Sequence, residues 1–180
     1  TSDFNNKKYN NFFPSAFLSY EFTEGENVSV SYSRRVRRPR GRMLNPISNY
    51  SSSINFFQGN PDLDPAFTNA FDIGYMKRIG QVTLNTSLYY NKTTDATQFV
   101  RRVDGVNEEG IPITISGPIN LATEHRYGLE VNLNFSPIRW WKINANANLY
   151  QQSTRGDFSY VDYQGNNVNQ NFDNDMFTFN

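Results

Sequence analysis

Short segments of strict alternation between apolar and polar residues recur along this 180-residue chain and constrain its fold more than any other feature. Between positions 127 and 135, Tyr, Leu, Val, Leu and Phe alternate with Gly, Glu, Asn and Asn. Positions 141 to 149 repeat the pattern, with lysine or asparagine at every second place. Successive side chains of a strand point to opposite faces, so the pattern predicts strands with one apolar and one polar face. Asparagine is poor in strands, so rows of it indicate polar surroundings on that face.

Six such segments predict three hairpins with short turns. In chain order the pairs are 15–22 with 27–33, 70–79 with 82–91, and 126–135 with 141–149. The polar stretches between the hairpins are expected to be long loops, at 34–67, 93–124 and 151–174. Residues 175–180 predict the start of a seventh strand. Loops longer than about 12–15 residues are uncommon in compact soluble domains, so these stretches count against a globular fold.

Aromatic residues gather near the two ends of the predicted strands. Near the short turns lie Tyr20, Phe22, Tyr75, Phe135, Trp140 and Trp141, and near the opposite ends lie Tyr32, Tyr90, Tyr127 and Tyr150. Two aromatic belts, with short turns on one side and long loops on the other, are typical of outer-membrane barrels. The predicted fold class is therefore all-β, an antiparallel up-and-down transmembrane β-barrel segment of six strands plus the start of a seventh. A soluble sheet with one wet face shows the same alternation and stays open as an alternative.

The alternation assigns residues to two faces. The lipid face is expected to include Val28, Val30, Phe71, Ile73, Val82, Leu84, Leu129, Val131, Leu133, Ile143, Ala145 and Ala147. The lumen face is expected to include Ser29, Ser31, Asp72, Asn85, Glu130, Asn132, Asn134, Asn144 and Asn146. Each face repeats its chemistry over several strands, which predicts one continuous sheet between lipid and a polar interior.

Composition excludes several classes of function. The mean hydropathy is −0.67 and no run of about 18 apolar residues exists, so no transmembrane helix is predicted. The 17 basic and 17 acidic residues balance, and no recognition module is present, which argues against a nucleic-acid partner. There is no cysteine, and the single histidine, His125, is expected to be a solvated residue at a strand start. No metal site, cofactor site or catalytic constellation is predicted, and the chain is not expected to be an enzyme.

Six arginines between positions 34 and 42 form the strongest charge cluster. They are Arg34, Arg35, Arg37, Arg38, Arg40 and Arg42. One interpretation is an extracellular rim that binds anionic lipopolysaccharide or an anionic ligand through guanidinium contacts. The other is that they face the lumen and pair with acidic residues of a neighbouring strand or of a plug. A second polar group, Asn60, Asp62 and Asp64, lacks the spaced oxygen ligands of a calcium loop and is interpreted as a turn.

Several motifs resemble TonB-dependent outer-membrane receptors, and the Bacteroidetes-type barrel domain in particular. In order they are Ser31-Tyr32-Ser33-Arg34-Arg35, Arg38-Pro39, Leu44-Asn45-Pro46, Gly59-Asn60-Pro61-Asp62-Leu63-Asp64-Pro65 and Phe71-Asp72-Ile73-Gly74-Tyr75. The family usually places glutamate after the last of these prolines, where this chain has Ala66. The resemblance therefore gives that position no carboxylate role here.

The resemblance implies a large plugged barrel of the 22-strand kind. It implies import of a scarce ligand, such as a siderophore, cofactor, glycan or peptide, with energy from the TonB complex reached through an N-terminal plug domain. A surface lipoprotein is a further partner of this kind of receptor. Six strands do not close a bacterial barrel, so residues 1–180 are expected to be an excerpt of one barrel domain without its plug. The alternatives are a passive porin-like channel and a soluble glycan-binding β-sandwich.

Overall fold

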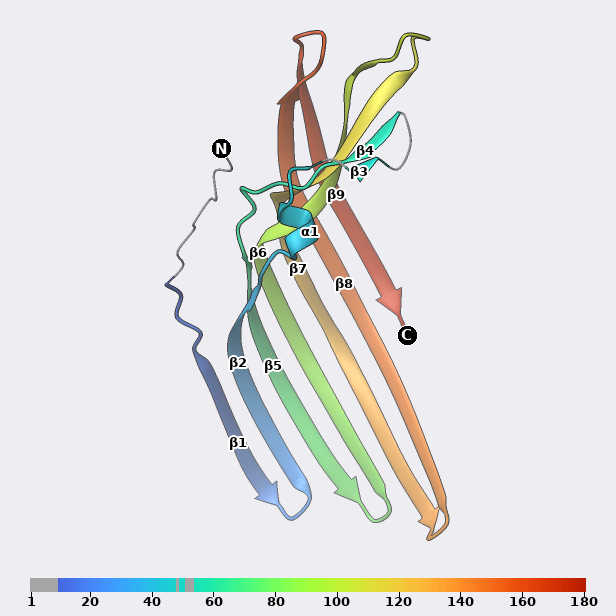
Figure 1. Ribbon diagram of the computed structural model, residues 1–180. Coiled ribbons are helices and arrows are strands. Elements are labelled where there is room, and N and C mark those ends of the chain that lie inside the picture. The colour runs from blue at the N-terminus through green and yellow to red at the C-terminus, as the bar shows by residue number, and fades with distance from the viewer. Residues whose placement is uncertain (1–9, 48, 51–53) are drawn as a thin grey trace.

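The computed structural model describes residues 10–47, 49–50 and 54–180, and within these the chain forms one sheet with a single helical turn. The elements in chain order are β1 (Ser15–Thr23), β2 (Glu26–Arg37), α1 (Gly41–Leu44), β3 (Asn49–Tyr50), β4 (Asn55–Phe57), β5 (Ala66–Ile79), β6 (Val82–Val106), β7 (Pro112–Ile138), β8 (Trp141–Val161) and β9 (Asn167–Phe179). The strand order in the sheet is β1-β2-β5-β6-β7-β8-β9, and these long strands lie side by side (Figure 1). No helix of the described residues is long and apolar enough to cross a membrane.

The three predicted hairpins are confirmed. β1–β2, β5–β6 and β7–β8 are antiparallel pairs, and their tight turns lie together at one end of the sheet (Figure 1). The connecting residues are Glu24-Gly25, Gly80-Gln81 and Arg139-Trp140. Gly25 and Gly80 have φ values of 80° and 58°, a left-handed conformation that glycine adopts without steric cost. In the first two hairpins, therefore, both the alternation and the turn residue favour the observed structure.

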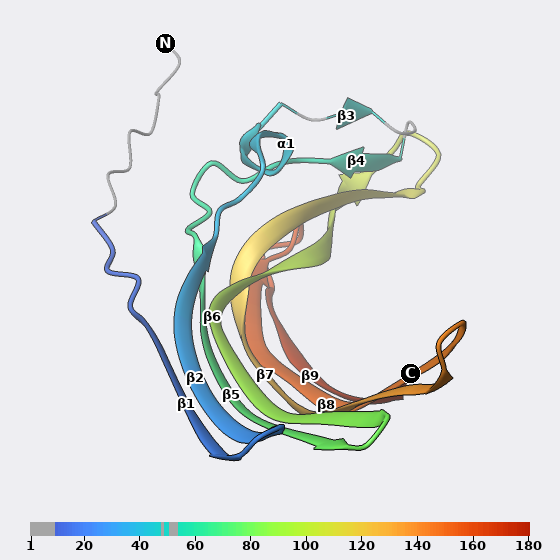
Figure 2. The ribbon, with the colours of Figure 1, turned by 90° about the horizontal axis from the view of Figure 1, so that it is seen from below.

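The strand register gives each face one kind of chemistry. Val30, Ile73 and Leu88 are successive partners across β2, β5 and β6, and they define what we call the outward face. Ser31 and Asp72, each one residue away, are partners on the opposite, lumen face. All the residues assigned to the two faces from the alternation fall on the expected sides of this register. Viewed along the strands, the sheet curves as an open trough, as part of a barrel wall does (Figure 2).

Two of the three expected long loops are wrong, because the strands continue through them. β6 and β7 extend to Val106 and from Pro112, so most of 93–124 is a hairpin with a bulge at Asp95. In the same way, β8 and β9 occupy most of 151–174, and the seventh strand begins at Asn167 rather than near residue 175. The alternation that marks the membrane-spanning parts is absent from these extensions.

The third stretch, between β2 and β5, is a true connection that returns to the sheet. Within it β4 pairs in parallel with Thr114–Ser116 of β7, beyond the point where β8 stops pairing with that strand. The described residues that are most buried lie where this connection meets the sheet. Leu63 is 3% exposed and Ala66 1%, and Ala96 and Ala122 on β6 and β7 are equally enclosed. The small packed core therefore lies at the end remote from the short turns.

Candidate functional site

The lumen face has two adjoining hollows, of about 420 and 380 Å³, near the middle of the sheet. They share four lining residues, namely Arg35 from β2, Ala70 from β5, Asn91 from β6 and Arg126 from β7. Ala70, Asn91 and Arg126 are successive partners in one register row that begins at Ser33, and Arg35 lies two residues beyond Ser33 on the same face of β2. The antiparallel pairing therefore brings two guanidinium groups from distant parts of the sequence to one polar surface.

The acidic residues around these hollows are bound to neutral groups. Ser87 Oγ donates to Asp72 Oδ2 at 2.5 Å, and Asn132 Nδ2 donates to Glu130 Oε1 at 3.0 Å. Gln152 Nε2 donates to Glu124 at 2.5 Å. Amide and hydroxyl donors stabilise these carboxylates without neutralising them, so the surface carries separate positive and negative points of charge.

Arg35 and Arg126 lack an acidic partner among the residues that the structure describes. Arg35 Nε donates to Ser33 Oγ at 3.2 Å. The Arg126 guanidinium lies 4.0 Å from the centre of the Tyr150 ring, while its Nε is enclosed and has no hydrogen-bond partner. A guanidinium offers several donors in a planar fork that suits carboxylate and phosphate groups. The hollow can therefore bind an anionic group presented from the lumen.

The six arginines of the sequence cluster do not form one surface. Arg34 faces outward, with its guanidinium 5.2 Å from the Phe67 ring centre, while Arg35 and Arg37 line the lumen hollow. Arg38 and Arg40 lie between β2 and α1. Arg42 belongs to α1 and lies 5.2 Å from the ring of Phe57 on β4. Arginines that are neighbours in the sequence are therefore separated, because successive residues of β2 point to opposite faces and because β2 ends at Arg37.

Arg126 was not singled out from the sequence, although it stands in the alternating segment on the same side as Gly128 and Glu130. Its neighbour Tyr150 was expected in the outer aromatic belt, and that placement is wrong. Tyr150 pairs with Gly128 on the lumen face, and a side chain at Gly128 would collide with it. The glycine thus makes room for the tyrosine ring over which Arg126 lies.

His125 is also not the solvated residue at a strand start that we expected. It lies within β7, is partly buried and faces outward, and its Nδ1 shares a hydrogen bond of 2.8 Å with the Tyr90 hydroxyl. The expectation was wrong because β7 begins at Pro112, well before the apolar alternation does. His125 therefore belongs to the outward surface of the sheet.

The Gly-Asn-Pro-Asp-Leu-Asp-Pro motif has a structural role. The Asp62 amide donates to Asn60 Oδ1 at 2.9 Å, which confirms the turn interpretation. Asn120 of β7 holds the end of the motif: its Oδ1 accepts from the Asp64 amide at 2.7 Å and its Nδ2 donates to the Asp64 carbonyl at 2.9 Å. A side chain at Gly59 would collide with the backbone of Asn45. No group of three metal-ligating His, Cys, Asp or Glu side chains occurs among the described residues.

Comparison with known proteins agrees with this architecture. No curated protein matches the chain. Among solved structures, the siderophore receptor PirA from Pseudomonas aeruginosa superposes with a TM-score of 0.65 at 16% identity, which shows a shared fold. The match covers 94% of this chain and 35% of that receptor, so the chain spans about a third of its length.

A model of the outer membrane protein β-barrel family matches residues 1–180, the whole sequence. This match decides between the membrane barrel and the soluble β-sandwich that alternation alone left open, and it places the chain in the outer membrane. The two faces of the sheet then have their expected surroundings, lipid outside and a polar lumen inside. The chain belongs to the outer membrane protein β-barrel family.

Proposed function

We propose that this chain is part of the barrel wall of a TonB-dependent receptor that imports a scarce ligand across the outer membrane. The observation that carries the proposal is the pair of lumen-facing guanidinium groups, Arg35 and Arg126, which have no acidic partner on the described strands. A wall that holds a separate plug or an anionic ligand needs such unneutralised donors, because their charge-assisted hydrogen bonds form only when the partner arrives. The barrel fold shared with a siderophore receptor and the motifs described above support the same function.

On this proposal the ligand is a siderophore, cofactor, glycan or peptide. The TonB complex is reached through an N-terminal plug domain outside these residues, and a surface lipoprotein is a further partner. Arg35 and Arg126 bind carboxylate or phosphate groups of the plug or of the ligand, while Asp72 and Glu130 orient neutral donors beside them. We expect no catalytic step and no bound cofactor.

A passive porin-like channel is the alternative function. Measuring the ionic conductance of the protein distinguishes a plugged importer from such a channel. The full-length protein is purified in detergent, inserted in planar bilayers and measured in potassium chloride. A plugged importer gives no steady ohmic current, whereas a steady open channel would contradict the proposal. In whole cells, uptake of a ferric siderophore carrying radiolabelled iron tests one ligand class, and a protonophore should abolish uptake that depends on TonB.

The role of the lumen arginines is tested with Arg126→Gln. We expect uptake of whichever probe is transported to fall about tenfold, the loss of roughly one charge-assisted contact, while assembly in the membrane is unchanged. Lys142→Gln is the matched control, because Lys142 also faces the lumen but lies near the short turns, away from the hollow. Equal uptake by the two variants would remove Arg126 from the binding surface.

A further inference from the structure

A row of aromatic side chains crosses the outward face near the middle of the long strands, where the apolar stretch that follows the short turns ends. Tyr32, Phe71, Tyr90 and Tyr127 are successive register partners on β2, β5, β6 and β7. The rings of Tyr32 and Phe71 are 4.9 Å apart between centres, and those of Phe71 and Tyr90 are 6.3 Å apart. Tyrosine and tryptophan gather where lipid meets water. This row therefore marks the outer interface of the membrane.

The hydroxyl groups of Tyr32 and Tyr90 show on which side of the aromatic row the water lies. Tyr32 Oη donates to Asn69 Oδ1 at 2.9 Å, and Tyr90 Oη shares a hydrogen bond with His125 Nδ1 at 2.8 Å. Both partners lie two residues farther from the short turns than the aromatic row itself. The apolar part of each ring thus lies toward the membrane and its polar end points to the next row.

That next row is basic. Arg34, Asn69, Lys92 and His125 are successive register partners across the same four strands. Neighbouring strands are about 4.8 Å apart, so the Arg34 and Lys92 backbones, one strand between them, are roughly 10 Å apart and their long side chains can converge. We call Arg34, Lys92 and His125 the basic row.

No residue of the basic row forms an ion pair with an acidic side chain in the part of the chain that the structure describes. Arg34 lies over Phe67, and its Nε has no hydrogen-bond partner. Lys92 is exposed. The outward-facing acid at this level, Asp175, is on β9, two strands beyond His125. The positive charge of Arg34 and Lys92 is therefore available to a group outside the protein.

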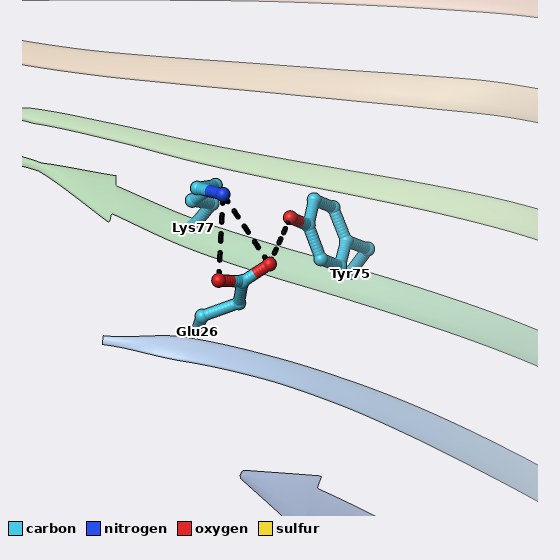
Figure 3. Close-up of polar contacts among 3 residues, drawn as sticks. All are labelled: Glu26, Tyr75 and Lys77. Atoms are coloured by element: carbon cyan, nitrogen blue, oxygen red, sulfur yellow. Dashed lines mark hydrogen bonds and ion pairs between the residues drawn. The ribbon is translucent and has the colours of Figure 1, made fainter. Parts of the chain in front are cut away.

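Near the short turns, by contrast, the outward-facing Lys77 forms an ion pair with an acidic side chain of the protein. Lys77 Nζ lies 3.3 Å from Glu26 Oε2, and Tyr75 Oη donates to Glu26 Oε1 at 2.6 Å (Figure 3). The cation near the short turns is thus neutralised within the protein, whereas those of the basic row are not. Short turns lie on the periplasmic side in this class of barrel, so the unneutralised charge faces the outer leaflet.

An apolar hollow of about 380 Å³ lies beside the aromatic row on its membrane side. Its outward-facing lining comprises Val30, Phe71, Ile73, Leu88, Tyr90 and Tyr127. Several of these side chains are about half exposed, among them Leu88 at 57% and Phe71 at 48%. In the membrane such a depression is filled by hydrocarbon.

We propose that the basic row and this hollow together bind a phosphorylated glycolipid of the outer leaflet, lipopolysaccharide, at the outer surface of the wall. Its phosphate contacts Arg34 and Lys92, with His125 beside them, and one acyl chain lies in the apolar hollow. The positive row adjoins the hydrocarbon boundary, where only an amphiphile with an anionic head can occupy both parts. This fit of charge and position selects a lipid over a soluble anion.

The test uses the full-length protein in detergent with lipid A as the probe, and native mass spectrometry as the readout. We expect Arg34→Gln/Lys92→Gln to lower the affinity for phosphorylated lipid A about tenfold or more, because two charge-assisted contacts are lost. The control Arg139→Gln/Lys142→Gln removes the same charge near the short turns and should bind as the unaltered protein does. Heat-modifiable mobility verifies that each variant is folded, and Lys92→Gln alone, at an exposed position, should give a smaller loss in the same direction.

Two further arms identify the ligand chemistry. Dephosphorylated lipid A should bind much more weakly than the phosphorylated form, and equal binding would overturn the phosphate contact. Inorganic phosphate should compete poorly, since it cannot occupy the hollow. Strong competition by it would overturn the lipid and leave a soluble anion site. Equal lipid A binding by the double variant and its control would overturn the role of the basic row.

Discussion

Arg34 and Arg35 are neighbours in the chain but meet different surroundings. Arg34 lies over Phe67 on the outward face, and Arg35 lines the lumen hollow. A shift of one residue along a strand exchanges lipid for water, because successive side chains point to opposite faces. The consequence of a substitution therefore depends more on whether the position faces lipid or the lumen than on the residue that is replaced.

Val131 and Asn132, which face lipid and lumen respectively, test this dependence on the face. Val131 faces outward, four residues from Tyr127 and four from Phe135, and so lies near the middle of the apolar band. We expect Val131→Arg to block assembly, because arginine near the bilayer midplane costs about 2–4 kcal/mol. Asn132→Arg should be tolerated, since it adds a cation beside Glu130 in the lumen. The yield of heat-modifiable protein in the outer membrane measures both, and equal assembly of the two variants would contradict the register.

At the scale of elements, the sequence predicts the membrane-spanning hairpins but not their extensions. The alternation exists only where one face meets lipid, so it stops where β6, β7 and β8 leave the membrane. The residues of the two far turns do indicate these extensions. Asn107 and Asp162 each stand three residues before a glycine with positive φ, and their side-chain oxygens accept from backbone amides two and four residues on. Asn or Asp followed at this spacing by glycine predicts a tight turn within a supposed loop.

The turn after β8 has a measurable acid dependence. Hydrogen bonds from Asn166, and then from Gln164, hold the pKa of the Asp162 carboxyl below its ordinary value of 3.8. A lowered pKa in the folded state means that the ionised carboxylate stabilises the turn above the ordinary value and that this support is lost as the pH falls through the lowered one. Carbon-13 NMR of labelled aspartate carboxyls, with Asp162→Asn for assignment, should show titration below pH 3.8. A pKa at or above that value would contradict the hydrogen-bonded turn.

The candidate site was predictable only in part, for a reason that belongs to strand pairing. Alternation places Glu130 on the lumen face, but it does not say which strands lie side by side or at what level, and Arg35 stood in a stretch that was expected to be a loop. The meeting of Arg35 with Arg126 depends on three successive registers, β2 with β5, β5 with β6 and β6 with β7. Likewise, the role of Asn120 depends on a connection that returns to the sheet from 56 residues away.

At the scale of the whole molecule, the position of short and long connections sets its orientation in the membrane. The tight turns at Gly80-Gln81 and Arg139-Trp140 share one end, and the extended hairpins with the turn at 162–166 lie at the other (Figure 1). Short turns are periplasmic and the longer connections extracellular in barrels of this kind. The aromatic row and the basic row are consistent with this orientation.

Because these 180 residues contain no cysteine, a single introduced one reports the orientation. Gln164→Cys should react with a membrane-impermeant maleimide on intact cells, since residue 164 lies exposed in the far turn. Gln81→Cys should react only after the outer membrane is disrupted. Labelling is read by the mass shift of the full-length protein, with any cysteines elsewhere in it replaced beforehand. The reverse pattern would place the short turns outside the cell.

The separation of the two faces also bears on how such a chain evolves. Each face requires only a class of side chain, apolar or polar, so most strand positions accept many substitutions and ancestral resemblance fades without a change of architecture. A fold shared with PirA at 16% identity agrees with this tolerance. Gly59 and Gly117 do not have this freedom, because backbone from another segment occupies the space of their missing side chains. In distant relatives, ancestry is therefore better recorded in these crowded contacts than in the broad surfaces of the wall.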